Sequence, residues 1–403
     1  MNVISNIVGG FSLPVVRSTF SILLSISLYI TYSTVNYSSK NLPTESLMPS
    51  YDFIIVGGGS AGAVVASRLS EIENWNVLLL EAGGDGSIIH DIPAAAATLQ
   101  LTEVDWKYTT EPSTNYCRAM EEGRCLWPRG KVIGGSSTIN YMLYVRGNKK
   151  DYDIWEQLGN PGWSYKDILS YFKKSEDNQS QNYTGTPYHS KGGYLTVEES
   201  QWHTPLAKAF LEAGREMGYE NRDINGERQT GFMIPQGTIR RGSRCSTGKA
   251  FMRPASARKN LHVAMQAHVT KILIDSSSKR AYGVEFFRDG MTLRVRANKE
   301  VIVSAGSINS PQLLMLSGIG PEEHLAEHGI TVIQNLSVGH NLQDHMFVTV
   351  ITFLVNKPVS LVESRVYDIL YILEYVIFGA GPLTELGGIE GLAFINTKYA
   401  NAS

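Results

Sequence analysis

The sequence YDFIIVGGGSAGAVVASRLSEIENWNVLLLE, residues 51–81, decides the fold of the chain. Residues 53–56 form a short apolar, β-branched run without helical periodicity, which predicts a buried parallel strand. A glycine-rich turn then leads into residues 63–69, where apolar residues recur at helical spacing. Residues 76–80 predict a second strand. The order strand, glycine-rich turn, helix and strand is typical of a dinucleotide-binding unit.

The residues of the turn suit the binding of a pyrophosphate. Gly57 permits the tight turn, Gly59 lets a pyrophosphate approach the backbone, and Gly62 lets the helix pack closely on the strand. The helix begins around Ser60 and Ala61, where free N–H groups carry about half a positive charge and attract phosphate.

Glu81, at the end of the second strand, has a carboxylate that suits a ribose 2′-hydroxyl and would repel a 2′-phosphate. A GxGxxG pattern alone is weak evidence, because glycine-rich loops also connect strands and helices that bind nothing. The acid in the expected place after the second strand favours the binding unit.

Composition limits the class of protein. The chain has 403 residues, which predicts about two domains. Its residues are 43% hydrophobic and 18% charged, as in a soluble globular protein, and the formal net charge is −2. This balance gives no reason to expect a nucleic acid or an anionic membrane surface as partner.

The amino-terminal segment has features of a targeting sequence. Arg17 precedes an apolar core at residues 20–30, which is too short for a stable membrane span of about 20 apolar residues. We expect a signal peptide or a weak anchor, with a disordered extension as the alternative, followed by a linker at residues 43–49. Four glycosylation sequons agree with a secreted glycoprotein, at Asn36, Asn178, Asn182 and Asn335.

Three cysteines are too few for a disulfide scaffold. Cys117 and Cys125 lie close together in a loop, and we expect them to form a disulfide in an oxidising compartment, with two free thiols as the alternative. Cys245 is expected to be an inert thiol, since nothing in the sequence marks a base near it.

Further motifs carry a resemblance to a known family. RGKVIGGSSTINYMLYVRGNKKDYD (residues 129–153) resembles the first signature of the glucose–methanol–choline (GMC) oxidoreductases, which are FAD-dependent alcohol oxidases and dehydrogenases. SAGSINSPQLLMLSGIG (304–320) is similar to their second signature, and VGHNLQDH (338–345) resembles another recurrent segment. DWKYTTEPS (105–113) and RCSTGKAFMRP (244–254) resemble most the branch of insect glucose dehydrogenase-like members.

The resemblance implies FAD as cofactor and a set of residues that bind it. Val269 would offer its backbone to the adenine, although a β-branched residue in a strand can also be plain core. The implied substrate is a small alcohol or sugar, and the electron acceptor a quinone or another compound. The implied cofactor-binding residues are Gly57, Gly59, Ser60, Ala61, Gly62, Glu81, Gly134, Gly135, Asn140, Val145 and Val269.

The expected fold class is α/β: a Rossmann-like FAD-binding domain, with a parallel sheet completed by a β-meander, and an inserted, incomplete substrate domain with an antiparallel sheet. We assign residues 1–48 to the signal or anchor and linker, 49–155 and 235–345 to the FAD-binding domain, and 156–234 and 346–403 to the substrate domain. Helices are expected at 165–174, 205–217 and 364–378, and strands at 261–267, 268–275, 281–289, 292–297 and 299–304.

No catalytic residue can be assigned from the sequence. His324 and His328 have the i, i+4 spacing of a metal pair but lack the order of a zincin motif, so a solvated helix face is the better interpretation and no metal site is expected. We expect His345 to be a structural histidine and not a catalytic one. Family members extend beyond residue 403, so we expect a sequence that ends before the family's catalytic histidine.

Two alternatives to an active FAD-dependent enzyme remain open. One is a secreted, non-catalytic flavin-binding protein with the same fold. The other is a nicotinamide-dependent Rossmann dehydrogenase, which the flavin-type second signature disfavours.

Overall fold

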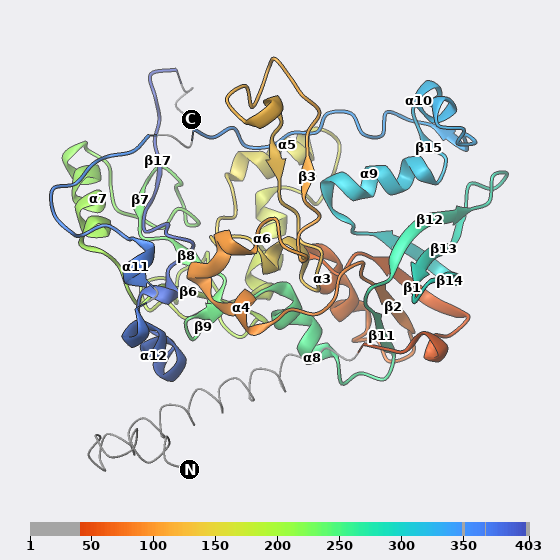
Figure 1. Ribbon diagram of the computed structural model, residues 1–403, viewed down its shortest axis with the longest axis horizontal. Helices are drawn as coiled ribbons and strands as arrows, with labels where there is room; N and C mark the ends of the chain where they lie inside the picture. Colours follow the sequence, from red (N-terminus) through yellow and green to blue (C-terminus); the bar gives the residue numbers. More distant parts are fainter. Residues whose placement is uncertain (1–40, 349–350, 367, 400–403) are drawn as a thin grey trace, which may run out of the picture.

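The computed structural model describes residues 41–348, 351–366 and 368–399 (Figure 1). The expected signal peptide or anchor and the sequon at Asn36 lie outside the described residues. Within the described ranges, no helix has both the length and the apolarity to cross a membrane.

The largest sheet of the described residues is mixed and has six strands, several of which are labelled in Figure 1. Strands β11, β2, β1 and the end of β14 run parallel, and β14, β13 and β12 form an antiparallel meander. The class of fold expected from the sequence is therefore confirmed. In sheet order the strands are β11 (Leu261–Ala264), β2 (Val77–Leu80), β1 (Ser50–Val56), β14 (Met291–Val303), β13 (Ala281–Arg288) and β12 (His268–Ile274).

Strand β14 joins the two halves of the sheet. Its first half pairs antiparallel with β13, and its second half pairs parallel with β1, for example Ile54 with Val301. The sequence predicted two strands here, 292–297 and 299–304, but no glycine or proline interrupts residues 292–303, so the backbone continues as one strand. The pairing with β1 shifts register between Tyr51 and Phe53, where the partner strand changes.

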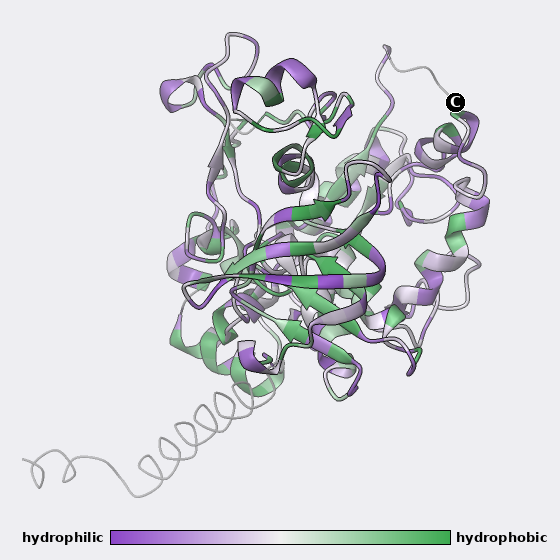
Figure 2. Ribbon diagram, turned by 90° about the vertical axis from the view of Figure 1, so that its right-hand side faces the viewer, coloured by the Kyte–Doolittle hydropathy of each residue, from purple (hydrophilic) through white to green (hydrophobic). Residues whose placement is uncertain are grey.

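Helices cover both faces of the parallel strands. On one face, Ile55 and Leu79 pack with Ala63 and Ala66 of α3 (Ser60–Leu69). On the other face, Ile54, Leu78 and Leu80 pack with Leu313 of α9 (Gly306–Leu316). Successive strand residues thus alternate between two apolar cores, which explains the continuous apolar runs of the sequence. Figure 2 shows the hydrophobic residues gathered along these strands.

A smaller mixed sheet lies beside the large one. β6 (Leu195–Glu199) pairs parallel with β5 (Glu176–Asn178) and antiparallel with β8 (Gln236–Gly237), so only one of its two pairings has the antiparallel direction expected for the substrate domain. A separate antiparallel pair joins β7 (Gly231–Met233) to β17 (Leu392–Phe394).

The two helices predicted before the meander are confirmed as α6 (Tyr165–Ser175) and α7 (Pro205–Glu216). The single helix predicted at 364–378 is instead two, α11 (Glu363–Val366) and α12 (Ile369–Phe378). The aspartate before α12 explains the break, because its carboxylate accepts a hydrogen bond from the Leu370 N–H and begins a new helix.

The remaining helices and strands are short. They are η1 (Thr44–Ser46), α4 (Ile88–Asp91), η2 (Pro93–Leu99), β3 (Tyr108–Thr109), η3 (Glu121–Gly123), β4 (Leu126–Trp127), η4 (Gly135–Thr138), α5 (Lys149–Gln157), β9 (Ile239–Arg240), β10 (Ser243–Arg244), η5 (Gly248–Met252), α8 (Arg253–Ala255), β15 (Ile319–Gly320), α10 (Glu322–Glu327), β16 (Gln334–Asn335) and η6 (Pro382–Thr384).

Residues 43–49, expected to be a linker, lie against the large sheet. The Leu42 N–H donates to the Val263 carbonyl over 2.8 Å, and Leu47 and Met48 pack against the core of the large sheet. Leu47 and Met48 are partly buried there, so each contributes less than the roughly 1.5–3 kcal/mol of full burial.

A buried charged network holds the smaller sheet. His189 lies between Glu176, 2.7 Å from Nδ1, and Asp223, 2.8 Å from Nε2, while Arg146 lies 3.0 Å from Glu176. Burial alone would raise the pKa of Glu176, but the hydrogen bond from His189 and the charge of Arg146 lower it below its usual range. Asn178 is fully buried in this network, so its sequon is not an accessible acceptor for a glycan.

The disulfide between Cys117 and Cys125 is confirmed, with the two Cα atoms 5.4 Å apart. The disulfide lies within the loop between β3 and β4. These two strands pair antiparallel with each other. Cys245, expected to be inert, is fully buried, and burial raises the pKa of its thiol.

Thiol labelling tests this arrangement on the native chain. We expect an alkylating reagent to label no cysteine of the folded protein, only Cys245 after denaturation without reductant, and all three cysteines after reduction. Cys245 serves as an internal control for complete denaturation. Labelling of Cys117 and Cys125 in denaturant alone would show that the disulfide does not form.

Candidate functional site

The first glycine turn lies between β1 and α3. Gly57 has φ +97°, and a Cβ on it would lie 2.6 Å from the Ser304 carbonyl oxygen. A Cβ on Gly62 would lie 1.9 Å from the Gly57 carbonyl oxygen. These two glycines are therefore required by close packing of the backbone.

Gly59 differs from its neighbours. A Cβ there would meet only the Gly135 Cα, at an ordinary contact distance of 3.7 Å, and the backbone is extended with φ −77°. Gly59 is also the N-cap of α3 and provides no side-chain cap, so the first N–H groups of that helix have no side-chain partner at the cap. The fold alone does not require a glycine here, which indicates that the space serves a ligand.

A cavity of about 790 Å³ opens at this turn. It lies at the carboxyl ends of three parallel strands, because the last residues of β1, β2 and β14 (Val56, Leu80 and Val303) line it. Ligands of open α/β sheets bind at this edge. Of the residues predicted to bind the cofactor, those that line the cavity are Gly57, Gly59, Ser60, Ala61, Glu81, Gly135 and Val269.

Glu81 is buried at the floor of this site. Its Oε2 accepts from the Gly58 N–H over 2.7 Å, and its Oε1 accepts from the Gly83 N–H over 2.8 Å. Burial raises the pKa of Glu81 to about 7, although both hydrogen bonds oppose the rise. A carboxylate has about four lone-pair positions, so each oxygen can still accept a hydrogen bond from a ligand.

The second glycine-rich run packs against the first. The Gly134 N–H donates to the Gly58 carbonyl over 2.8 Å, and a Cβ on Gly135 would lie 2.6 Å from the Gly59 Cα. Gly135 and Ser136 line the cavity, as expected of a loop that lets backbone approach a planar ligand.

Four predicted site residues do not line this cavity: Gly62, Gly134, Asn140 and Val145. The first two pack the glycine turns. Asn140 holds its own loop, since its Oδ1 accepts from the Met142 N–H and from Arg244 Nη1, 3.1 and 2.9 Å away. Val145 lies at the surface with 38% of its area exposed.

Several residues at the cavity were missed by the sequence analysis. Trp106 and His268 line it, with their rings 5.6 Å apart. Asn309 lines it as well and accepts a hydrogen bond from the Tyr108 hydroxyl over 2.6 Å. Trp106 and Asn309 lie in DWKYTTEPS and SAGSINSPQ, two segments that resemble the family, so this resemblance could have pointed to them. Burial and the charge of Lys131 lower the pKa of His268.

Arg244 holds the second glycine-rich loop through hydrogen bonds to its backbone. Its side chain is fully buried, and Nη1 donates to the carbonyl oxygens of Asn140 and Ser137 over 2.7 and 3.2 Å. Nε donates to the His90 carbonyl over 2.7 Å. The sequence did not predict that the first arginine of RCSTGKAFMRP would be buried and would hold this loop.

The three histidines singled out in the sequence all lie at the surface. His324 and His328 lie with their rings 4.9 Å apart, at the end of α10, and His324 is exposed, as on a solvated helix face. His345 is exposed, and its backbone N–H bonds Asp344. Asp344 also accepts from the Trp127 indole over 2.6 Å and lies 3.8 Å from Arg129, a residue of the cavity wall.

Comparisons with known proteins identify the family. The family profile described as GMC oxidoreductase matches residues 51–347, so the chain belongs to the GMC oxidoreductase family. Glucose dehydrogenase [FAD, quinone] of Drosophila melanogaster is 45% identical over 354 residues, which cover 87% of this chain and 56% of that protein. Oxygen-dependent choline dehydrogenase of Sinorhizobium medicae is 46% identical over 77% of this chain and 55% of that protein.

Solved structures agree with this assignment. An FAD-dependent oxidoreductase from Chaetomium thermophilum superposes with a TM-score of 0.73 at 30% identity, over 85% of this chain and 61% of that one. Pyridoxine 4-oxidase from Mesorbium loti has a TM-score of 0.66 at 33% identity, over 71% of this chain and 55% of that one. The chain spans little more than half the length of the curated relatives it matches.

Proposed function

We propose that the cavity binds FAD. The pyrophosphate would lie against Gly59 and the start of α3, the adenosine ribose at Glu81, and the adenine beside Val269. The support is the open space at Gly59, the uncapped N–H groups of α3 and a buried carboxylate with free lone pairs. Gly135 and Ser136 add small residues to the lining of the cavity.

The function that fits best is oxidation of a CH–OH group of an alcohol or sugar by an FAD-dependent oxidoreductase. The cavity, built from two glycine turns and the segment 304–309 at the carboxyl edge of the sheet, carries this conclusion. FAD supplies a hydride acceptor when it is bound. The residues described here bind and orient it, and none of them is assigned as the base that takes the hydroxyl proton.

The relatives suggest the finer assignments. Glucose or choline is a candidate substrate, and a quinone a candidate electron acceptor, because these compounds appear in the names of the relatives. Secretion as a glycoprotein is supported by the disulfide and by exposed sequons at Asn182 and Asn335.

The domain division that we propose is 49–155 with 235–345 for the cofactor and 156–234 with 346–403 for the substrate. The large sheet lies in the first pair of ranges, and the pairing of β7 with β17 joins the two ranges of the second. β8 and Arg146 cross the division, since both contact the smaller sheet.

Spectroscopy on the purified chain tests the function. We expect a flavin absorption spectrum, and bleaching of that spectrum when glucose, choline or a simple alcohol is added without oxygen. NADH formation from NAD with the same compounds is the control for a nicotinamide enzyme. A bound flavin that no substrate reduces would favour the non-catalytic alternative, and absence of flavin would contradict the proposed cofactor.

A further inference from the structure

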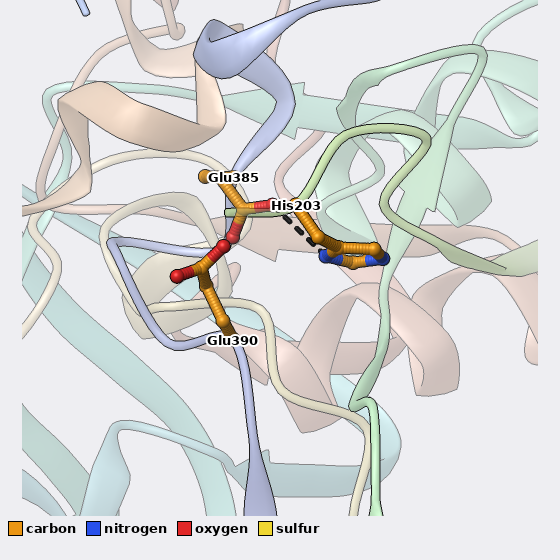
Figure 3. Close-up of side chains that lie close together, drawn as sticks. All are labelled: His203, Glu385 and Glu390. Atoms are coloured by element: carbon orange, nitrogen blue, oxygen red, sulfur yellow. Dashed lines mark ion pairs between the residues drawn. The ribbon is translucent and has the colours of Figure 1, made fainter. Parts of the chain in front are cut away.

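A cluster of three ionisable side chains lies apart from the cofactor cavity. It consists of His203, Glu385 and Glu390, and Figure 3 shows the three side chains converging from two segments of chain. One ligand atom of each lies within 4.8 Å of those of the other two. His203 precedes α7, and the two glutamates follow η6, so the cluster joins segments about 180 residues apart.

Glu385 is a buried carboxylate with one unsatisfied oxygen atom. The residue is 1% exposed, and its Oε1 accepts from the Ser200 hydroxyl over 3.0 Å. Its Oε2 is buried and makes no hydrogen bond. A buried carboxylate oxygen without a partner is costly, so it points to a group that the chain itself does not supply.

His203 lies next to the carboxylate of Glu385. Its Nδ1 lies 3.3 Å from Glu385 Oε1 but is buried without a hydrogen bond. Protonation of the imidazole would balance one carboxylate and leave the second negative charge in place. A divalent cation between the three side chains would balance both carboxylates and give a ligand bond to His203 Nδ1 and Glu385 Oε2, which make no hydrogen bond.

Hydrogen bonds from neighbouring residues orient the carboxylates of Glu385 and Glu390. Thr204 donates to Glu390 twice, from its hydroxyl to Oε2 over 2.5 Å and from its backbone N–H to Oε1. The Ser200 hydroxyl donates once to Glu385, to Oε1. Ligand carboxylates in metal sites are usually fixed by such outer hydrogen bonds.

We propose that His203, Glu385 and Glu390 bind one divalent transition cation, with zinc as the preferred ion. One imidazole nitrogen and two carboxylate oxygens are ligands that zinc accepts in sites with three protein ligands and a water. Zinc bonds of 2.0–2.2 Å place neighbouring ligand atoms roughly 3.4 Å apart. The pair His203 and Glu385 already has this spacing, and the side chain of His203 is 26% exposed, which leaves a path for the ion.

Calorimetry on the full chain, freed of metal with a chelator, tests the site. We expect about one Zn²⁺ to bind per chain, Mn²⁺ to bind more weakly and Mg²⁺ hardly at all. His203→Gln and Glu390→Gln should each weaken Zn²⁺ binding at least roughly tenfold. The matched control is His324→Gln with His328→Gln, because this exposed pair of imidazoles lies outside the proposed site and has the i, i+4 spacing of a metal pair.

A second measurement needs no variant. Zn²⁺ should protect His203, and not His324, from diethyl pyrocarbonate, as read by peptide mass spectrometry. The proposal fails if the unaltered chain binds no Zn²⁺, if both single variants bind it as the unaltered chain does, if the double histidine variant loses it, or if Zn²⁺ leaves His203 reactive. The test is independent of the flavin, whose spectrum reports only that the variants are folded.

Discussion

A chain in which Gly59 is replaced by valine is expected to fold and to carry no flavin. The Cβ at this position would meet only the Gly135 Cα, 3.7 Å away, and the backbone conformation is open to any residue. The protein therefore tolerates the side chain, but the space toward the cavity is what a pyrophosphate needs. We expect at least about a hundredfold loss of FAD affinity, since a displaced phosphate loses several hydrogen bonds to charged oxygen at about 1.5–3 kcal/mol each.

The measurement is the ratio of flavin to protein absorbance after purification, with a thermal melt of the flavin-free forms. Gly62→Val is the matched contrast, because its Cβ would lie 1.9 Å from the Gly57 carbonyl oxygen and should prevent folding. A Gly59→Val protein with a normal flavin content would remove the pyrophosphate from this turn.

Much of the large sheet could be predicted because its signals are local. The run at residues 53–56 is apolar on both faces, and the structure buries Ile54 in one core and Ile55 in the other. The first two strands of the meander are separated by turn residues, and their predicted positions are confirmed. The continuous strand β14 was not predicted, because pairing with β13 and β1 on different edges is a non-local property that the sequence between 292 and 303 does not mark.

The cofactor site was predicted only in part, because only some of its residues belong to a local sequence motif. The glycines and Glu81 belong to a motif of short span, and most of them line the cavity. Trp106, His268 and Asn309 come from three distant segments and meet only through the tertiary fold. Spacing along the sequence points to His324 and His328 as a metal pair. The cluster of His203, Glu385 and Glu390 instead joins segments far apart in the sequence, near the pairing of β17 with β7.

Glu81→Gln is expected to weaken FAD binding by roughly ten- to a hundredfold. The carboxylate accepts from the N–H groups of Gly58 and Gly83, one on each oxygen. A glutamine would turn an NH₂ group toward one of these donors and would offer a ribose hydroxyl a neutral acceptor in place of a charged one, a difference of about 1.5–3 kcal/mol. Titration of the flavin-free protein with FAD, followed by flavin fluorescence, gives the ratio of affinities.

The pKa of Glu81 makes the stability of the flavin-free protein depend on pH. Burial raises this pKa from 4.5 to about 7 in the folded chain. Between these values the folded state holds the proton and the unfolded state has lost it, so the free energy of unfolding falls as pH rises from about 4.5 to about 7, by up to roughly 3 kcal/mol. Above pH 7 this group contributes no further change. Urea melts of the unaltered chain should show this slope, and Glu81→Gln should lack it.

The same carboxyl should make FAD binding depend on pH in the opposite direction. A ribose hydroxyl donates to the charged form, so below the pKa of about 7 part of the binding energy is used to remove a proton from Glu81. We expect FAD to bind about tenfold more weakly at pH 6 than at pH 8, and Glu81→Gln to abolish this difference. His268 also lines the cavity, but its pKa is lowered, so His268→Gln should retain the difference. An unchanged affinity between pH 6 and pH 8 in the unaltered chain would show that the ribose does not use the Glu81 carboxylate.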